Sequence, residues 1–593
     1  MEKSQIFQEM ISRISKLSQD SYLMVTDMQH NLTFVPESTA EFLGIPSGWC
    51  EDGYKIVLEK SVHPYDCPEY TEEMKKRLRG INLENDLYIR MGKDKKYVMT
   101  QIITDMILEQ GKNRYFIVLL RNQNVIPEID PLTDLYGQVK FEKEVRSYMP
   151  WKIHKKRHLT SFQVIILGFA GVILFGALIL MLPISSAQAI ITPFHKALFT
   201  STSAVCVTGL AVLDTGSYWS VFGQTVIMFL IQIGGLGVIT TATSVFILSG
   251  RKISIMQRST MQNAISAPKV GGIVRLMSFI LKGTLLIELI GALFMMPVFC
   301  HDFGLRGIWM SIFHSVSAFC NAGFDLLGTK WHPFVSLTSY AVNPVINIVI
   351  MLLIIIGGIG FFTWEDIYLH KFHFKHYHMQ SKVILTTTLC LILLPAVFFF
   401  FQDYGNLSGI HRLLASLFQA VTPRTAGFNT TDLSMLTGAS KAMMILLMLI
   451  GGSPSSTAGG MKTTTFALLL LNVLATFQSC DDVTAFGRRI DASVIKNATT
   501  IAMMYFILFF AGGMTISVYE GLPLSSCLFE AASAVGTVGL TLGITPKLHI
   551  LSQIILIILM YLGRVGGLTL IYAVFSDKNK RKAKLPLDKI IVG

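Results

Sequence analysis

The 593-residue sequence has few charged side chains and no pattern of paired cysteines. Only 15% of the residues are Asp, Glu, Lys or Arg, whereas 51% are hydrophobic, and the mean hydropathy is +0.52. This composition excludes a soluble multidomain protein and predicts an integral membrane protein. The eight cysteines are scattered, which favours packing roles over a disulfide framework or a zinc site. The N-terminal MEKSQIFQEM lacks an apolar segment, so we expect no cleaved signal peptide.

The excess of basic residues is distributed as in membrane proteins. The formal net charge is +12, and outside the N-terminal region the Lys and Arg residues cluster beside apolar runs. In that position they act as topological signals rather than as contacts to nucleic-acid phosphates. We therefore expect membrane lipid around this protein and no nucleic-acid partner.

The first 125 residues have the composition of a soluble domain. Alternating residues predict antiparallel strands at Asp86–Met91, Lys96–Leu108 and Arg114–Asn122. The earlier stretch SYLMVTDMQHNLTFVPESTAEFLGIP is typical of two strands and a short helix, and through TFVPESTAEFLG it resembles a PAS sensory domain. Another small α+β domain is the alternative. We expect residues 1–125 to form a PAS-like cytosolic domain, whose ligand the sequence leaves unknown.

A linker follows this domain. The stretch DPLTDLYGQVKFEKEV, which begins at Asp130, resembles the opening of a diguanylate cyclase domain. No GG(D/E)EF loop follows it before the first apolar run, so a complete cyclase is excluded. We interpret residues 126–160 as a helical linker that ends in the basic collar Trp151–Leu159.

Eight apolar runs of membrane-spanning length begin at Phe162. At about 1.5 Å per residue, the first of them exceeds a hydrocarbon core of about 30 Å. Between the members of each pair lies a semi-apolar segment of about ten to fourteen residues, which is too short to cross and which we interpret as a re-entrant pore helix. The eight runs are residues 162–184, 220–249, 273–299, 340–368, 383–402, 441–476, 497–518 and 548–576.

The loops that join one pair of runs to the next are basic. They are Gly250–Arg258, His370–Lys382, Gly487–Arg489 and, after the last run, Asp577–Lys584. By the positive-inside rule they face the cytoplasm, which predicts a multi-pass protein of the cytoplasmic membrane with both termini inside. The histidines of the second loop are interpreted as part of a solvated cationic flank, with a metal site as the alternative.

The four re-entrant segments are repeats of one another. They read SAVCVTGLAV, SAFCNAGFDL, AVTPRTAGFN and SAVGTVGLTL, and they align at Gly209, Gly323, Gly427 and Gly539 with a period of about 110 residues. A dehydrated monovalent cation needs a cage of oxygens, which backbone carbonyls supply where Gly lets the peptide planes turn toward an axis. The C-termini of the pore helices add partial negative charge. The pattern therefore predicts a cation filter.

The filter segments carry a family resemblance. TVG at Thr537–Gly539 resembles the potassium-channel filter, and CVTGL, NAGF, TPRTAGFNT and GTVGLT together resemble the Trk/Ktr/HKT superfamily of potassium uptake proteins. Gly at all four aligned positions resembles the potassium-selective members, since the sodium-selective plant relatives have Ser at the first. The implied filter residues are Val207, Thr208, Gly209, Asn321, Ala322, Gly323, Thr425, Ala426, Gly427, Thr537, Val538 and Gly539.

The same resemblance implies the architecture. It implies an α-helical integral membrane protein in which four span-pore-span repeats, with eight transmembrane helices and four pore helices, surround one pore. The repeats would be residues 161–258, 259–380, 381–490 and 491–593. The resemblance also implies a homodimer and a regulatory cytosolic nucleotide-binding RCK ring. No G-x-G-x-x-G motif of that ring occurs after a strand in this chain, so the ring would be a separate protein.

Two features lie in the apolar runs themselves. GGSPSSTAGGMKTTT breaks the sixth run and cannot continue a regular helix, and it resembles the family's intramembrane gating loop, with a kinked packed helix as the alternative. Arg564 is a lone cation in the last run, where the resemblance implies an electrostatic barrier below the filter. The implied gating residues are Gly451, Gly452, Ser453, Pro454, Ser455, Ser456, Thr457, Ala458, Gly459, Gly460, Lys462 and Arg564.

Three features depart from the family pattern. Cys320 stands where Asn is common, Ser455 stands where Gly is common, and a PAS-like domain precedes the membrane part. Glu288 in the third run is interpreted as a structural hydrogen-bonding residue rather than an ion site. We expect a potassium uptake protein without enzymatic activity. The alternatives are a sodium-coupled or sodium-conducting transporter and a membrane sensor that conducts nothing.

Overall fold

The computed structural model describes six strands between residues 21 and 122 and then residues 161–238, 240–241, 273–371, 373–407, 409–480 and 482–566. The chain divides into two units. One contains residues 1–158 with residues 579–593, and the other contains residues 159–578. The predicted helix of the PAS-like domain, the linker and the basic segments Gly250–Arg258 and Asp577–Lys584 lie outside the described residues.

The first unit contains one antiparallel sheet. Its strand order is β3-β2-β1-β6-β5-β4, so that the first strand pairs with the last and lies at the middle of the sheet. The three strands predicted between Asp86 and Asn122 are confirmed, while the PAS identity stays a prediction. The strands are β1 (Ser21–Asp27), β2 (Leu32–Val35), β3 (Gly48–Trp49), β4 (Leu87–Lys93), β5 (Lys96–Gln110) and β6 (Asn113–Asn122).

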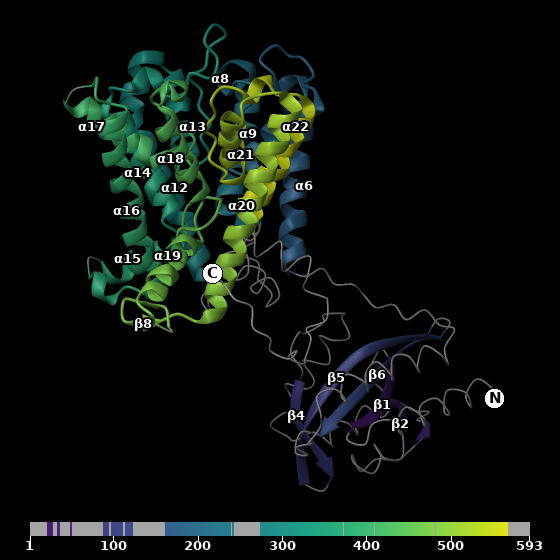
Figure 1. The fold of residues 1–593 in the computed structure, drawn as a ribbon. Helices are drawn as coiled ribbons and strands as arrows, with labels where there is room; N and C mark the ends of the chain where they lie inside the picture. The colour runs from purple at the N-terminus through teal and green to yellow at the C-terminus, as the bar shows by residue number, and fades with distance from the viewer. Residues whose placement is uncertain are drawn as a thin grey trace. The chain divides into compact units, whose positions relative to one another are not determined.

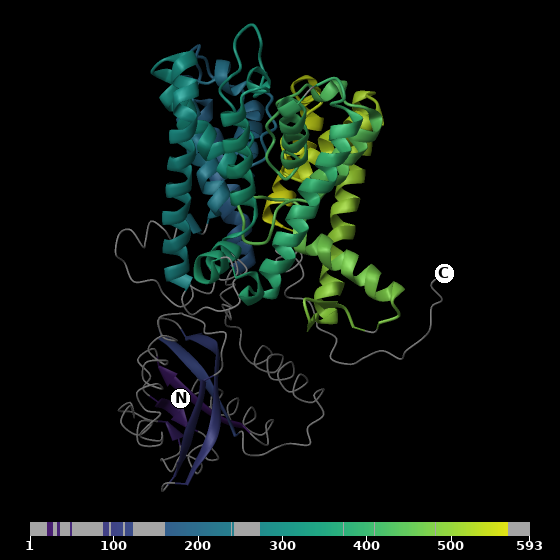
Figure 2. The same cartoon turned by 90° about the vertical axis from the view of Figure 1, so that its left-hand side faces the viewer.

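The second unit is a helical bundle (Figures 1 and 2) that contains four long apolar helices. By length and composition, these four are the helices of the described residues that can each cross a membrane alone. About a third of each apolar window is buried inside the protein, so the remaining apolar surface is left for lipid. The four helices are α6 (Ser161–Met181), α12 (Ile273–Phe303), α16 (Met379–Gln402) and α20 (Ala492–Glu520).

Each long helix packs against a short helix that follows it along the chain. The short helices have 12, 14, 13 and 12 residues, and each ends just before one of the predicted filter segments. The predicted position and length of these short helices are therefore confirmed, while their re-entrant course in the membrane stays a prediction. They are α7 (Phe194–Val205), α13 (Arg306–Phe319), α17 (Gly409–Val421) and α21 (Leu524–Val535).

The second apolar run of each pair forms a shorter helix than predicted. These helices have 16, 15, 12 and 16 residues, too few to cross a hydrocarbon core of about 30 Å. Three of them end near a glycine with positive φ: Gly237 (89°), Gly360 (92°) and Gly566 (87°). Within the described residues, the predicted runs 220–249, 340–368 and 548–576 are therefore interrupted at these glycines and are not single continuous helices. The helices are α9 (Val221–Leu236), α14 (Pro344–Gly358), α18 (Gly438–Leu449) and α22 (Ile550–Val565).

Two of these runs continue after their break. The chain bends by 97° between α14 and α15 (Phe361–His370). After α18 it forms the predicted irregular segment and resumes as α19 (Thr463–Phe477), which confirms that the sixth run is broken. The remaining elements are α8 (Thr215–Tyr218), the strands β7 (Thr484–Ala485) and β8 (Arg488–Arg489), and the 3-10 helices η1 (Pro183–Ser185), η2 (Thr338–Tyr340), η3 (Phe374–His376), η4 (Leu433–Met435) and η5 (Thr545–Lys547).

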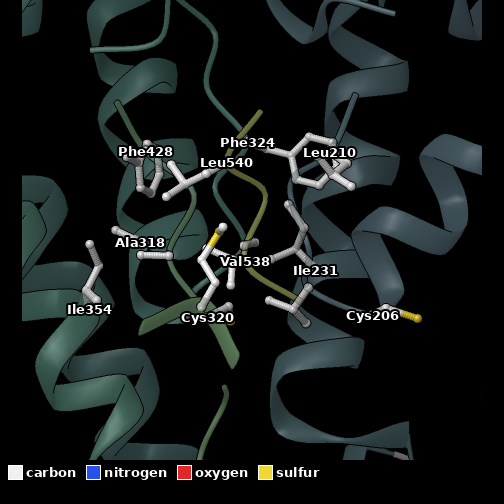
Figure 3. Packing of buried hydrophobic residues seen from close by; sticks show 14 of the residues in the cluster. Cys206, Leu210, Ile231, Ala318, Cys320, Phe324, Ile354, Phe428, Val538 and Leu540 are labelled. Carbon is white, nitrogen blue, oxygen red and sulfur yellow. The ribbon is translucent and has the colours of Figure 1, made fainter. Parts of the chain in front are cut away.

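The core of the bundle lies around the filter segments. The residue after each aligned glycine is a buried hydrophobic one, and these four side chains lie at one level in Figure 3. A fully buried phenylalanine also occupies each of the four short helices. Repeated packing of this kind holds the ends of the short helices together. The eight residues are Leu210, Phe324, Phe428, Leu540, Phe199, Phe313, Phe418 and Phe529.

Candidate ion pore

The four predicted filter segments share one unusual backbone conformation. In each, the residue two positions before the aligned glycine has a left-handed φ between 51° and 61°, and the glycine itself has a φ between 68° and 95°. A left-handed residue other than Gly costs about 1–2 kcal/mol, so four copies require surroundings that enforce them. The non-glycine positions are Val207, Asn321, Thr425 and Thr537.

The four glycines close a ring. A methyl group built on any of them would lie within 2.6 Å of a carbonyl oxygen in the next segment, so only Gly fits. Gly209 faces the oxygen of Ala322, and Gly323 faces that of Ala426. The other two contacts, from Gly427 to the oxygen of Val538 and from Gly539 to that of Thr208, complete the circle. The structure thus brings all four segments together.

Hydrogen bonds to the short helices orient the peptide planes of the ring. In three segments the amide of the residue before the glycine donates back to its own short helix, as Thr208 N does to Ser203 O at 2.8 Å and Val538 N to Ser533 O at 2.8 Å. In the third segment Ala426 N donates to Thr422 O, just after α17, at 3.0 Å. The Ser203 hydroxyl then accepts from the amide of Gly209 at 3.0 Å. The carbonyl oxygens of these residues lie against the glycine of a neighbouring filter segment.

Two buried polar side chains behind the filter were missed by the sequence analysis. Glu530 accepts hydrogen bonds from the hydroxyl groups of Thr541 and Thr545, each at 2.5 Å, and from the amide of Leu542 at 3.0 Å. His314 accepts from the amide of Leu326 at 3.4 Å. Both side chains anchor the chain that leaves a filter segment. Each is a polar residue in an apolar helix, and both precede the aligned glycine of their segment by the same number of residues. This pattern could have identified them from the sequence.

A carboxylate pair also lies beyond the filter and was not predicted. Asp325 follows Gly323 by two residues, and its carboxylate accepts from the amide of Leu327 at 3.1 Å. Burial, and then the Asp214 carboxylate, raise the pKa of Asp325 to about 7. Asp214 itself is held by the amide of Ser217 at 2.8 Å. The ionised fraction of this pair would attract cations toward the ring.

The segment Gly451–Lys462, the candidate gating loop, is fixed against the ends of other helices. The amide of Ser453 donates to the oxygen of Gly358 at 2.9 Å, and the amide of Gly460 donates to the oxygen of Gly563 at 3.3 Å. These acceptors are carbonyl groups at the C-terminal ends of α14 and α22, which lack partners within their own helices. The loop is therefore built into the breaks of the short second helices.

The candidate gating loop also contacts the filter directly. The Thr457 hydroxyl lies 3.1 Å from the oxygen of Phe319 and 3.3 Å from Oδ1 of Asn321, a predicted filter residue. Gly459 packs so closely on Thr537 that a methyl group there would overlap the Thr537 hydroxyl. The loop thus lies against two of the four filter segments, as the resemblance implied.

Arg564 bonds to backbone oxygens of two elements. Its guanidinium donates to the carbonyl of Thr457 in the gating loop and to the carbonyls of Gly234 and Gly235 in α9, the last at 3.1 Å. Lys462 Nζ donates to the oxygen of Ala458 within the loop at 2.7 Å. Both cations therefore stabilise the loop in its present position.

Glu288 and the histidine-rich loop were also interpreted from the sequence. Glu288 accepts from Nε2 of Gln232 at 3.3 Å and lies 3.9 Å from the sulfur of Cys320, which agrees with a structural role. Within the described part of the chain, no group of three or more His, Cys, Asp or Glu residues could hold a metal ion. The interpretation of the histidine-rich loop as a cationic flank stays a prediction.

Comparisons with known proteins agree with this geometry. Residues 146–582 match the TrkH family, described as cation transport protein. The chain is 40% identical to the potassium/sodium uptake protein NtpJ of Enterococcus hirae over 450 residues, which cover 74% of this chain and 98% of that protein. It is 38% identical to the Ktr system potassium uptake protein B of Bacillus subtilis, with coverage of 74% and 99%.

A solved structure is similar as well. The potassium transporter TrkH from Vibrio parahaemolyticus matches with a TM-score of 0.55 and 19% identity, over 74% of this chain and 90% of that one. At that identity the match supports the fold, and the sequence relatives support the family. This chain is a membrane protein that belongs to the TrkH family of cation transport proteins.

Proposed function

We propose that this protein carries potassium across the cell membrane into the cell through the carbonyl ring of its four filter segments. The single observation that supports this most is the closed circle in which each filter glycine faces a carbonyl oxygen of the next segment. Such a ring can replace the hydration shell of a monovalent cation without any charged side chain. Two relatives are named for potassium uptake, which agrees with the proposal.

Sodium transport is the second candidate, because the relative NtpJ is named a potassium/sodium uptake protein. Purified protein in liposomes, loaded in turn with potassium and sodium at equal concentration, separates the two. We expect potassium flux to exceed sodium flux. Equal fluxes of the two ions would refute potassium selectivity, and no flux of either ion in both the wild type and the Ser453–Gly459 deletion variant would favour a non-conducting sensor.

The regulation proposed for this pore uses the candidate gating loop. In the structure the loop is bonded below the filter to Arg564 and to helix ends, which supports its role as a barrier to ions. We further infer a homodimer, a separate cytosolic RCK ring and cytoplasmic termini, all implied by the family resemblance. The mass of the purified protein in lipid nanodiscs tests the dimer, because a monomer mass would exclude it.

A further inference from the structure

A basic cavity lies where α16 begins, away from the proposed pore. It has a volume of about 250 Å³ and is formed by the turn between α15 and α16 together with the β7–β8 hairpin. Figures 1 and 2 show α15 and this hairpin at the same end of the bundle. The cavity is lined by Lys375, His376, Tyr377, His378, Met379, Lys382, Phe486 and Arg488.

Specific contacts hold the two walls of the cavity in place. The rings of Phe374 and Phe486 pack with their centroids 6.3 Å apart, which joins the turn to the hairpin. Lys382 Nζ donates to the oxygen of Lys375 at 2.7 Å. The hairpin is closed by a hydrogen bond from Ile490 N to Val483 O at 2.9 Å. The cavity is therefore formed by ordered contacts between two segments about 110 residues apart.

The charged side chains that line the cavity are all positive. Lys375, Lys382 and Arg488 carry permanent positive charge, and no carboxylate is among the described residues that line the cavity. The nearby carboxylate of Asp366 is buried and already bonded, to His378 Nδ1 at 2.6 Å and to the Ser381 hydroxyl at 2.5 Å. Three unneutralised cations repel one another, so an anion bound among them would lower the electrostatic energy.

The start of α16 adds to this preference. The helix has 24 residues, and its N-cap residue, His378, makes no capping side-chain hydrogen bond. The amide of His378 already donates to Asp366 at 3.1 Å, so the first-turn amides from Met379 onward, in the cavity wall, add a smaller partial positive charge to that of the lysines and Arg488. Phosphate is the anion that suits such a combination of amides and Lys or Arg side chains.

The size and surroundings of the cavity favour a lipid phosphate. Its volume is below the roughly 300–1,000 Å³ of pockets that bury drug-sized ligands, so it suits a headgroup better than a nucleotide. The membrane-crossing helix α16 starts at the cavity, and α15 bends by 97° from α14. Beyond that bend Tyr368 and Leu369 are 71% and 62% exposed, as expected for an apolar helix surface at a membrane interface.

We propose that this cavity binds the phosphate headgroup of an anionic phospholipid. The cations and the helix start bind the phosphate, while the acyl chains extend over the apolar surface of the neighbouring helices. Bound lipid would join the α15–α16 turn to the β7–β8 hairpin. The proposal concerns binding alone and does not depend on which ion the pore conducts.

The test measures thermal unfolding of the full-length purified protein in mixed micelles. The probes are dioleoylphosphatidylglycerol, dioleoylphosphatidylcholine and, without lipid, inorganic phosphate or glycerol 3-phosphate. The test variant is Lys375→Gln/Arg488→Gln. The matched control is Lys371→Gln/Arg489→Gln, which removes two positive charges from the same two segments at residues that do not line the cavity.

We expect phosphatidylglycerol to raise the unfolding temperature of the wild type and of the control above that in phosphatidylcholine. In the test variant the half-saturating phosphatidylglycerol concentration should rise about 25-fold, at about fivefold per lost cation. Equal responses to the two lipids would overturn the proposal, as would equal half-saturation in test and control variants. Full stabilisation by inorganic phosphate or glycerol 3-phosphate at the same concentrations would show that the site takes a free phosphate instead of a lipid.

Discussion

Replacement of Arg564 by Gln should open the pore. The side chain donates to the carbonyl of Thr457 in the gating loop and to two carbonyls of α9, so it bridges the loop to a different repeat. A hydrogen bond from a charged donor contributes about 1.5–3 kcal/mol. Loss of the bond to Thr457 alone would therefore raise the population of displaced loop by about 10- to 150-fold.

The charge of Arg564 acts in the same direction. At an effective dielectric of about 20, a unit charge about 7 Å from a passing cation repels it by roughly 2 kcal/mol, or about thirtyfold in occupancy. The lysine variant separates the two effects, because it keeps the charge and loses the forked pair of donors. If repulsion dominates, Arg564→Lys resembles the wild type, and if the bridge dominates, it resembles Arg564→Gln.

The assay is potassium efflux from loaded liposomes, together with the unfolding temperature of each variant. We expect at least a tenfold gain in flux for Arg564→Gln. Arg412→Gln is the matched control, because Arg412 also donates to a backbone oxygen, that of Phe400, but lies in α17 away from the gating loop. A lower unfolding temperature without any gain in flux for Arg564→Gln would refute both effects and leave Arg564 a purely structural residue.

The other predictions concern the filter, the loop and the topology. Gly209→Ser should weaken the preference for potassium over sodium, since its side chain would lie 2.5 Å from a carbonyl oxygen of the next filter segment; unchanged selectivity would argue against the ring. Deletion of Ser453–Gly459 should raise flux without any partner, and a fall in flux of folded protein would make the loop structural. Glu530→Gln should destabilise the protein by about 2–3 kcal/mol in chemical denaturation, and no change would exclude its anchoring role. In cells, Cys480 should react with an impermeant maleimide only from the cytoplasmic side, and labelling from outside would reverse the topology.

Two controls help to interpret the Gly209→Ser variant and the labelling of Cys480. Gly171→Ser places the same side chain on α6, where a methyl group would meet nothing within 4 Å, so it should leave selectivity unchanged. Cys300 lies near the opposite end of α12 from its start, in a half-buried position, and serves as the outside reference in the labelling experiment. If the topology is right, the two cysteines react from opposite sides.

The re-entrant helices and filter glycines could be predicted from the sequence, whereas the ends of the short second helices could not. Gly209 and the three glycines aligned with it recur at a regular spacing, which the sequence alone shows. A glycine that ends a helix with a positive φ is also set by the local sequence. For α9 and α14, however, the apolar runs continue past Gly237 and Gly360, so hydropathy alone predicted longer helices. The sequence G-G-x-G at both positions was the available signal for these breaks.

The partners of Arg564 lay beyond sequence reasoning for a different reason. Its acceptors Gly234 and Thr457 are 330 and 107 positions away along the chain. Only the closure of the four repeats brings α9, the gating loop and α22 together, and one sequence contains no local pattern that specifies which carbonyl a long side chain reaches. A lone Arg in an apolar run predicts a costly buried cation, but the residue type leaves its partner open.

If the candidate gating loop has its proposed role, its hydrogen bonds set how strongly it would keep the pore closed. Apart from its bonds to Thr463 and Asn321, the loop has six hydrogen bonds to α13, α14, α15 and α22, so it cannot move without breaking contacts in the neighbouring repeats. At a net value of about 1 kcal/mol each, their loss would cost about 6 kcal/mol and leave the displaced loop populated at roughly one part in 10⁴. A regulatory partner would have to bind the open state more tightly than the closed one by a similar free energy. Arg564→Gln and the loop deletion should therefore reduce the dependence of flux on such a partner as well as raise basal flux. The six bonds are Ser453 N to Gly358 O, Thr457 N to Gly357 O, Phe361 N to Ser455 O, Gly460 N to Gly563 O, Thr457 Oγ1 to Phe319 O and Arg564 Nη1 to Thr457 O.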